Sequence, residues 1–366
     1  MSGERILAAC SPGEVRVAVL RGGKFLDYAI WRPGQPDGVG DVYRGRVTAP
    51  MPGMAGAFVT LGAEDGFLPD SEGGKGLTIG TILPVRVTRA AIGGKGPRLS
   101  GRGVEAVEAG AIGLIRRGPG ALERLSRVYP DAEIQIDDPA MASAIKTVMA
   151  GEGPPPTTIV AQAFDDDIAG RVDALADPVV ALPNGARLSI HPTPALVAID
   201  TDSGGQTGSL NAFNRSIGPA LAREIRLRNL SGAIVVDLAG LPIRKRAALG
   251  PSIAEALAED PLKPRFLGFT ALGLAEILRT RIHPPLHELL AGPHAAGLAA
   301  LREIAANLDP DPRRLPVLRA APAVVEALQR DPVALPDLAR RTGRALTLRS
   351  DPSLTGTAWR LEHDHA

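Results

Sequence analysis

Apolar and polar residues alternate along several short segments in the first hundred residues of the chain. Between residues 5 and 31, alternating runs are separated by tight turns, one of them at Gly22-Gly23, and this predicts a small β-meander. Residues 41–100 contain five further short runs divided by glycine turns, a pattern typical of a small closed barrel. We therefore expect two β-rich units before residue 100.

After residue 110 the pattern changes to a mixture of strands and helices. Residues 111–117 and 132–136 have the pattern of strands, and a helix is expected around residues 139–149. From residue 182 the predicted elements are strands 186–190, 195–200 and 233–237, a helix at 220–229 opened by Pro219, and amphipathic helices at 251–260 and 272–282. The tail from residue 298 alternates helices with a closing strand at 345–351.

The composition mainly excludes certain classes of protein and of site. With 366 residues, 42 glycines and 33 prolines, the chain suits two to four units with short strands better than one helical bundle. Cys10 is the only cysteine, which excludes an internal disulfide and a thiolate zinc site and indicates a reducing compartment. No apolar run approaches the roughly 18–20 residues of a membrane span, and the N-terminus is not a convincing signal peptide. We expect a soluble, cytoplasmic protein.

The formal net charge of +1 hides two basic stretches. Between residues 86 and 127, nine Lys or Arg residues are opposed by three Glu residues, and a second basic stretch covers residues 215–246. Such stretches are candidate surfaces for a phosphate backbone. A solvated arginine-rich face explains the charge equally well, so charge alone leaves both interpretations open.

Two apolar runs end in an aspartate, Asp200 in "ALVAID" and Asp237 in "AIVVD". If the helix between these strands is a crossover connection, the strands are parallel and their ends meet at one edge of a sheet. Mg²⁺ takes oxygen ligands and often only one or two carboxylates, the rest being water and phosphate oxygens. The pair therefore predicts a magnesium site suited to phosphodiester hydrolysis. The alternative is that each aspartate caps the turn or helix that follows it.

At these residues the sequence resembles the ribonuclease E/G family of magnesium-dependent endoribonucleases. The resemblance rests on "ALVAIDTDSGG", "AREIRLRNLSGAIVVD" and "LGLAEILRTR", and continues upstream in "GDVYRGRVTAPMPGMAGAFVTLGAEDGFLP", "GLIRRGPG" and "LPNGARLSIHPT". These segments occur in the family's order and cover nearly the whole chain. The resemblance implies an α+β multidomain fold, in which an RNase H-like part carries an inserted S1-type OB barrel.

The resemblance also implies boundaries for the parts of the chain. Residues 1–36 would begin the RNase H-like subdomain, residues 37–103 would form the OB barrel, and residues 104–181 a reduced sensor and RNase H-like region. Residues 182–290 would form a DNase I-like catalytic subdomain, and residues 291–366 a small C-terminal α/β domain.

Roles for single residues are also implied by the resemblance. It makes Asp200 and Asp237 the magnesium ligands and puts Asp202 where the family has an asparagine that assists at the scissile phosphate. Phe58 and Phe67 match barrel aromatics on which bases stack, Lys95 a nearby phosphate contact, and Arg117 the arginine that senses a 5′-monophosphate. Aromatic faces combined with cations are how single strands are held with little sequence preference. For the two phenylalanines, core packing is the alternative.

The resemblance implies a Mg²⁺-dependent endoribonuclease that cleaves single-stranded RNA in RNA processing or decay. Two other readings stay open: a catalytically weakened RNA-binding protein on the same scaffold, and a phosphodiesterase acting on DNA or small nucleotides. No membrane partner is expected.

Departures from the family pattern motivate the second reading. Gly118-Pro119 replaces the threonine that completes the 5′-phosphate pocket, Pro194 replaces a glutamate, and Asp202 adds a negative charge beside the proposed metal. The segment after Arg117 is also shortened, which weakens the expectation of 5′-end sensing. Residues 288–297 lack the paired cysteines that share zinc between subunits, so a zinc-linked tetramer is not expected, while a homodimer stays open.

Overall fold

The computed structural model describes residues 3–105, 110–204, 210–308 and 314–365. The chain forms two compact units. Unit 1 consists of Met1–Pro36, Gly120–Arg279 and Pro285–Ala366, and unit 2 of Asp37–Pro119 and Thr280–Pro284. Within the described ranges, no helix has the length and apolar character needed to cross a membrane. Helices and strands are mixed throughout, which confirms the predicted α+β class.

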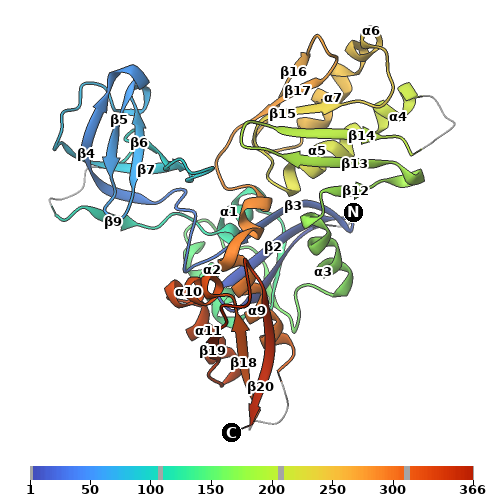
Figure 1. Ribbon diagram of the computed structural model, residues 1–366. Coiled ribbons are helices and arrows are strands. Elements are labelled where there is room, and N and C mark those ends of the chain that lie inside the picture. The colour runs from blue at the N-terminus through green and yellow to red at the C-terminus, as the bar shows by residue number, and fades with distance from the viewer. Residues whose placement is uncertain (1–2, 106–109, 205–209, 309–313, 366) are drawn as a thin grey trace. The chain divides into compact units, whose positions relative to one another are not determined.

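Unit 2 is a small β-barrel (Figure 1). Its strands are, in chain order, β4 (Val42–Met51), β5 (Gly56–Thr60), β6 (Asp65–Pro69), β7 (Ile82–Arg89) and β8 (Arg98–Ser100), and β9 (Gly113–Arg116) adds to the edge of β4. The strand order is β5-β6-β8-β7-β4, and β4 pairs back with β5, so five strands close into a barrel. Its interior is filled by Val47, Val59, Leu68, Val85 and Leu99. The closed barrel predicted for residues 41–100 is confirmed.

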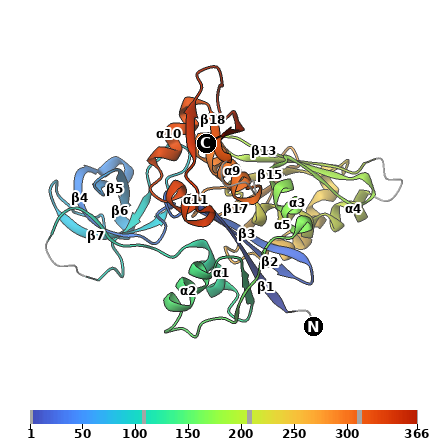
Figure 2. The ribbon, with the colours of Figure 1, turned by 90° about the horizontal axis from the view of Figure 1, so that it is seen from below.

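The N-terminal sheet of unit 1 has the order β11-β10-β1-β2-β3. Its strands are β1 (Glu4–Ser11), β2 (Glu14–Arg21), β3 (Lys24–Trp31), β10 (Glu133–Ile136) and β11 (Thr157–Ile159). The alternation of β1 sends Ile6 and Ala8 to a core with α1 (Ala121–Val128) and α2 (Pro139–Val148), which lie together beside the sheet in Figure 2. Leu7 and Ala9 enter a second core with α3 (Asp166–Asp173) on the opposite face.

The middle sheet of unit 1 has the order β12-β13-β14-β15-β17-β16. Its strands are β12 (Val179–Ala181), β13 (Arg187–Pro192), β14 (Val197–Asp202), β15 (Gly232–Asp237), β16 (Arg265–Phe269) and β17 (Ala275–Arg279). The associated helices are α4 (Leu210–Ser216), α5 (Gly218–Leu227), α6 (Ile243–Arg246) and α7 (Gly250–Leu257). One face of the sheet packs against α5 and α7, because every second strand residue is apolar and buried there. The other face carries the more exposed residues, both polar and apolar.

One sequence prediction in this sheet is wrong. Residues 272–282 do not form an amphipathic helix; they contain β17, which pairs antiparallel with both β15 and β16. The apolar residues of this segment fit a helical period and a strand period about equally well. The turn at Gly273, with φ of 85°, and the burial of Ala275 and Ile277 on one face favour the strand.

The C-terminal part of unit 1 is a three-stranded sheet of order β19-β18-β20 packed on helices. Its elements are α8 (Leu286–Leu290), α9 (Gly292–Ala306), β18 (Arg314–Ala320), α10 (Pro322–Arg330), α11 (Ala334–Thr342), β19 (Thr347–Ser350) and β20 (Trp359–His365). The predicted closing strand at 345–351 is confirmed as β19, and its partner β18 lies parallel to it.

Candidate active site

Asp200 and Asp237 lie side by side in the middle sheet. β14 and β15 are parallel, as predicted, and the two aspartates are register partners, Asp237 being the last residue of β15. Neighbouring strands are about 4.8 Å apart, and partners in register point to the same face. Both aspartates are exposed, whereas the preceding Ile199 and Val236 are buried. Two carboxylates from separate chain segments therefore share one exposed face.

Buried polar contacts connect the ends of these two strands. The buried hydroxyl of Thr201 accepts a 2.9 Å hydrogen bond from the backbone N–H of Ala239, just beyond β15. Asn214 of α4 donates to the carbonyl oxygens of Leu210, at 2.7 Å, and Ala239, at 2.9 Å. These bonds connect the loop after β15 to the end of β14 and to α4. Asn214 could not be identified from the sequence, because nothing in its local pattern marks it.

Asp237 is oriented by an arginine that the sequence analysis did not single out. Arg246 Nη1 lies 3.0 Å from Asp237 Oδ1, and the same guanidinium donates to the carbonyl oxygens of Leu241 and Gly273. The Arg246 side chain is only 11% exposed, while that of Asp237 is 54% exposed. Arg246 belongs to the short helix α6, "IRKR", and its position in the second basic stretch was the only signal for it.

Asp202 lies on the same face of β14 as Asp200, and both of its carboxylate oxygens accept hydrogen bonds. Arg187, its register partner in β13, donates from Nε at 3.0 Å and from Nη2 at 2.7 Å to Asp202 Oδ2, and Gly204 N–H donates to Oδ1 at 2.9 Å. The Gly204 hydrogen bond and the Arg187 guanidinium lower the pKa of Asp202 below its ordinary value. The negative charge that departs from the family pattern is thus paired with a cation.

The donor set of this face suits a hard cation held by few protein ligands. Across the ranges that the structure describes, no group of three or more His, Cys, Asp or Glu side chains is arranged to hold a metal ion. Asp200 and Asp237 offer carboxylate oxygens only, and Mg²⁺ commonly binds one or two carboxylates and keeps several waters. The residues present therefore fit a Mg²⁺ ion completed by water and phosphate oxygens.

The two predicted stacking residues are neighbours on the barrel. Phe58 of β5 and Phe67 of β6 are register partners, with ring centroids 5.6 Å apart at 69°. Both are half-buried, while Val59 and Leu68, which follow them, are fully buried in the barrel interior. Lys95 is exposed in the turn between β7 and β8. This arrangement leaves two aromatic rings at the barrel surface.

Arg117 is engaged in a local network of unit 2. Its Nη1 lies 2.6 Å from Oδ2 of the buried Asp41, and Gly118 N–H donates to Asp41 Oδ1 at 2.7 Å. The Arg117 side chain is still 57% exposed. A buried carboxylate needs such partners, so Arg117 and Gly118 act at least as the anchors of Asp41.

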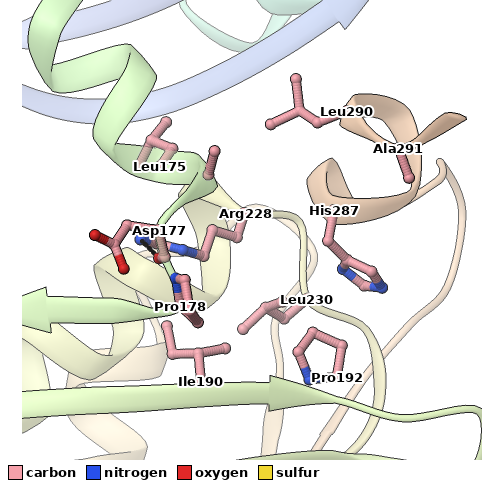
Figure 3. Close-up of a pocket in the computed structure, with 11 residues that line it drawn as sticks. Leu175, Asp177, Pro178, Ile190, Pro192, Arg228, Leu230, His287, Leu290 and Ala291 are labelled. Carbon is pink, nitrogen blue, oxygen red and sulfur yellow. Dashed lines mark hydrogen bonds between the residues drawn. The ribbon is translucent and has the colours of Figure 1, made fainter. Parts of the chain in front are cut away.

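A separate cavity of about 320 Å³ lies in unit 1, and none of the predicted site residues lines it (Figure 3). Leu175, Ile190, Leu230 and Leu290 give it apolar walls, and His287 of α8 borders it. Burial lowers the pKa of His287. Arg228 pairs with Glu224 and donates to the Asp177 carbonyl oxygen at 3.1 Å, so its charge is satisfied internally. This cavity therefore offers no evident binding site for phosphate.

A pair of aspartates on an exposed sheet face can hold a metal ion for phosphodiester chemistry, and a pair of aromatic rings on a barrel can stack with bases. A middle segment of the chain is similar to the ribonuclease E/G family. The model of that family matches residues 106–282, a segment that includes Asp200, Asp202 and Asp237.

Curated relatives extend the similarity over more of the chain. Ribonuclease E of Escherichia coli K12 is 24% identical over 77% of this chain, which corresponds to 37% of that protein. Ribonuclease G of Haemophilus influenzae is 24% identical over 79% of this chain and 82% of its own length, and ribonuclease G of Escherichia coli K12 is 25% identical over 78% and 81%. The chain thus spans little more than a third of ribonuclease E and about four-fifths of ribonuclease G.

Proposed function

We propose that this protein is an endoribonuclease that cleaves single-stranded RNA with a Mg²⁺ ion held by Asp200 and Asp237. The observation that carries the proposal is the register of these two aspartates on adjacent parallel strands, both exposed on one face. The names of the relatives support RNA as the substrate. The role of such an enzyme would lie in RNA processing or decay.

The residues of the chain would have distinct parts in this reaction. Asp200 and Asp237 would hold the ion, which when bound supplies an activated water and polarises a phosphoryl oxygen. Arg246 holds the Asp237 carboxylate in place, and Arg187 neutralises Asp202, so that less negative charge opposes the incoming phosphate. Phe58 and Phe67 would stack with bases, and Lys95 would contact the backbone.

A second candidate function is RNA binding without efficient cleavage. It is favoured by the ion pairs of Asp202 with Arg187 and of Arg117 with Asp41, because each side chain already has a partner of opposite charge in the described structure.

A cleavage assay on an unstructured RNA oligomer separates the two candidates. We expect Mg²⁺-dependent cleavage by the unmodified protein and a loss of at least about a hundredfold in Asp237→Asn, because the variant removes one of two charged ligands. Asp131→Asn, which changes an exposed aspartate of unit 1 outside the middle sheet, is the matched control and should retain activity. RNA binding without cleavage by the unmodified protein would reject the nuclease and support the binding protein.

A further inference from the structure

Three arginines gather on the barrel unit from three separate segments of the chain. Arg89 ends β7 and is the register partner of Arg98 at the start of β8. The segment Thr280–Pro284 returns to the barrel after the middle sheet, and its Ile282 carbonyl oxygen accepts a 2.8 Å hydrogen bond from Ala90 N–H. Arg281 is thereby brought beside the end of β7. Arg281 follows Arg89 by about 190 residues, so the sequence alone does not show that the two side chains are close together.

Without a bound anion, the three positive charges of this cluster repel one another and destabilise the fold. Throughout the described residues, no ion pair links Arg89, Arg98 or Arg281 to a carboxylate, and the half-buried Arg89 has a buried Nε without a hydrogen-bond partner. Burial lowers the pKa of Arg89, and the positive charges of Arg98 and Arg281 lower it further. Like charges held together and partly removed from water destabilise a fold unless an anion joins them.

The cluster continues the aromatic surface of the barrel. Phe67 pairs with Arg98 in the short parallel contact of β6 and β8, and Phe67 N–H donates to the carbonyl oxygen of Pro97 at 2.9 Å. Phe67 in turn contacts Phe58 edge to face. The two aromatic rings and the three arginines are therefore neighbours on the barrel. Proteins hold single strands by this combination, because bases stack on the rings and the cations contact the backbone.

We propose that Arg89, Arg98 and Arg281 form a phosphate-binding site for the sugar-phosphate backbone of the RNA strand whose bases stack on Phe58 and Phe67. The identity of the ligand as RNA rests on the proposed function; the need for an anion rests on the cluster itself. Guanidinium groups suit this ligand because each presents a planar set of donors to phosphate oxygens. Since such contacts read the backbone, the site carries no sequence preference.

The test is equilibrium binding of a labelled single-stranded RNA to the full chain in EDTA, measured by fluorescence anisotropy from 50 to 300 mM salt. The variants are Arg89→Gln, Arg98→Gln and Arg281→Gln. We expect each to weaken binding by about fivefold and to reduce the slope of log K against log salt by about 0.7, the value for one phosphate contact on a single strand. Arg98→Lys should recover most of the slope, because the charge is kept.

The matched control is Arg330→Gln on α10, an exposed arginine paired with Glu326 outside the barrel unit. It should leave affinity and slope unchanged. The melting temperature of the three cluster variants should be unchanged or higher, since each removes one of three like charges, so weaker binding would not reflect unfolding. Unchanged affinity and slope in all three variants would overturn the proposal.

Two further measurements test the phosphate-binding site separately from the proposed nuclease activity. A DNA strand of the same sequence should lose affinity by the same factor in each variant; a loss confined to RNA would contradict a phosphate contact. Cleavage in Mg²⁺ is scored independently. Weakened binding in the variants together with no cleavage by the unmodified protein would support the phosphate site and reject the nuclease, whereas cleavage with unchanged binding would do the reverse.

Discussion

At the scale of single residues, the ion pair between Arg187 and Asp202 changes what Asp202 can do. Taken from the sequence, Asp202 is an extra negative charge beside Asp200. In the structure, one of its oxygens is bonded to Arg187 and the other to Gly204 N–H. Asp202 is therefore better described as half of a neutral pair than as an additional metal ligand. Arg187 alternates with the buried Leu188 and Ile190 of β13 and so lies on this face, but only the pairing of the strands shows which residue it contacts.

This pairing predicts a non-additive effect on RNA cleavage. Arg187→Gln should raise KM by about fivefold, because it leaves an unpaired carboxylate close to the incoming phosphate. Asp202→Asn should have a smaller effect, and the double variant should approach the unmodified protein, since both charges are then removed. Steady-state kinetics of the four proteins gives the coupling. Additive losses in the double variant, or a changed Mg²⁺ requirement in Asp202→Asn alone, would show that Asp202 acts at the metal instead.

At the scale of elements, the local sequence pattern predicted helices and strands correctly where the apolar residues followed a single period. The helix of residues 218–227, opened by a proline, and strands β14 and β15 were predicted within a few residues. The segment 272–282 failed because its apolar positions satisfy both periods. Pairing with β15 and β16 then decided the outcome, and pairing depends on residues distant in sequence.

Helix α2 offers a prediction about pH and stability. Asp138 caps this helix by accepting from Met141 N–H at 2.8 Å, and it pairs with Arg341 of α11 at 2.6 Å. Burial raises the pKa of Asp138, but the Met141 hydrogen bond and the charges of Arg341 and Arg340 outweigh it, so the pKa lies below its ordinary value. A carboxylate with a lowered pKa stabilises the fold above its unfolded pKa, and that stability is lost as the pH falls through the folded pKa.

We therefore expect Asp138→Ala to lower the free energy of unfolding by about 1 kcal/mol at pH 7, the typical cost of a lost cap. Asp138→Asn should cost less, because an asparagine still caps. Denaturant unfolding at pH 7 and at pH 3 measures both variants. The difference from the unmodified protein should shrink below about pH 4, and an equal loss at both pH values would contradict a role for the charge.

At the scale of the whole molecule, the single cysteine sets the expectation for metal dependence. Cys10 is half-buried, and burial together with the nearby Asp137 and Asp138 raises the pKa of its thiol, so it is poorly suited to bind zinc as a thiolate. No second cysteine is present to complete a zinc link.

Metal removal should therefore act on chemistry and leave assembly unchanged. We expect EDTA to abolish cleavage and added Mg²⁺ to restore it, while the sedimentation coefficient stays the same with and without a zinc-selective chelator. Analytical ultracentrifugation and the cleavage assay on one preparation provide both readouts. A drop in mass on zinc chelation would contradict this expectation.

The sequence by itself determined most kinds of element, the closed barrel, and the residue types available for chemistry: two aspartates at strand ends, two barrel phenylalanines and two arginine-rich stretches. These follow from local periodicity and turn residues, which need only neighbouring positions. The tertiary structure decided which residues share a face. It paired Asp202 with Arg187 and Arg117 with Asp41, turned residues 275–279 into a strand, and brought Arg281 to the barrel. The register between strands and the return of Thr280–Pro284 to the barrel both depend on packing between segments that are distant in sequence. No local pattern predicts them.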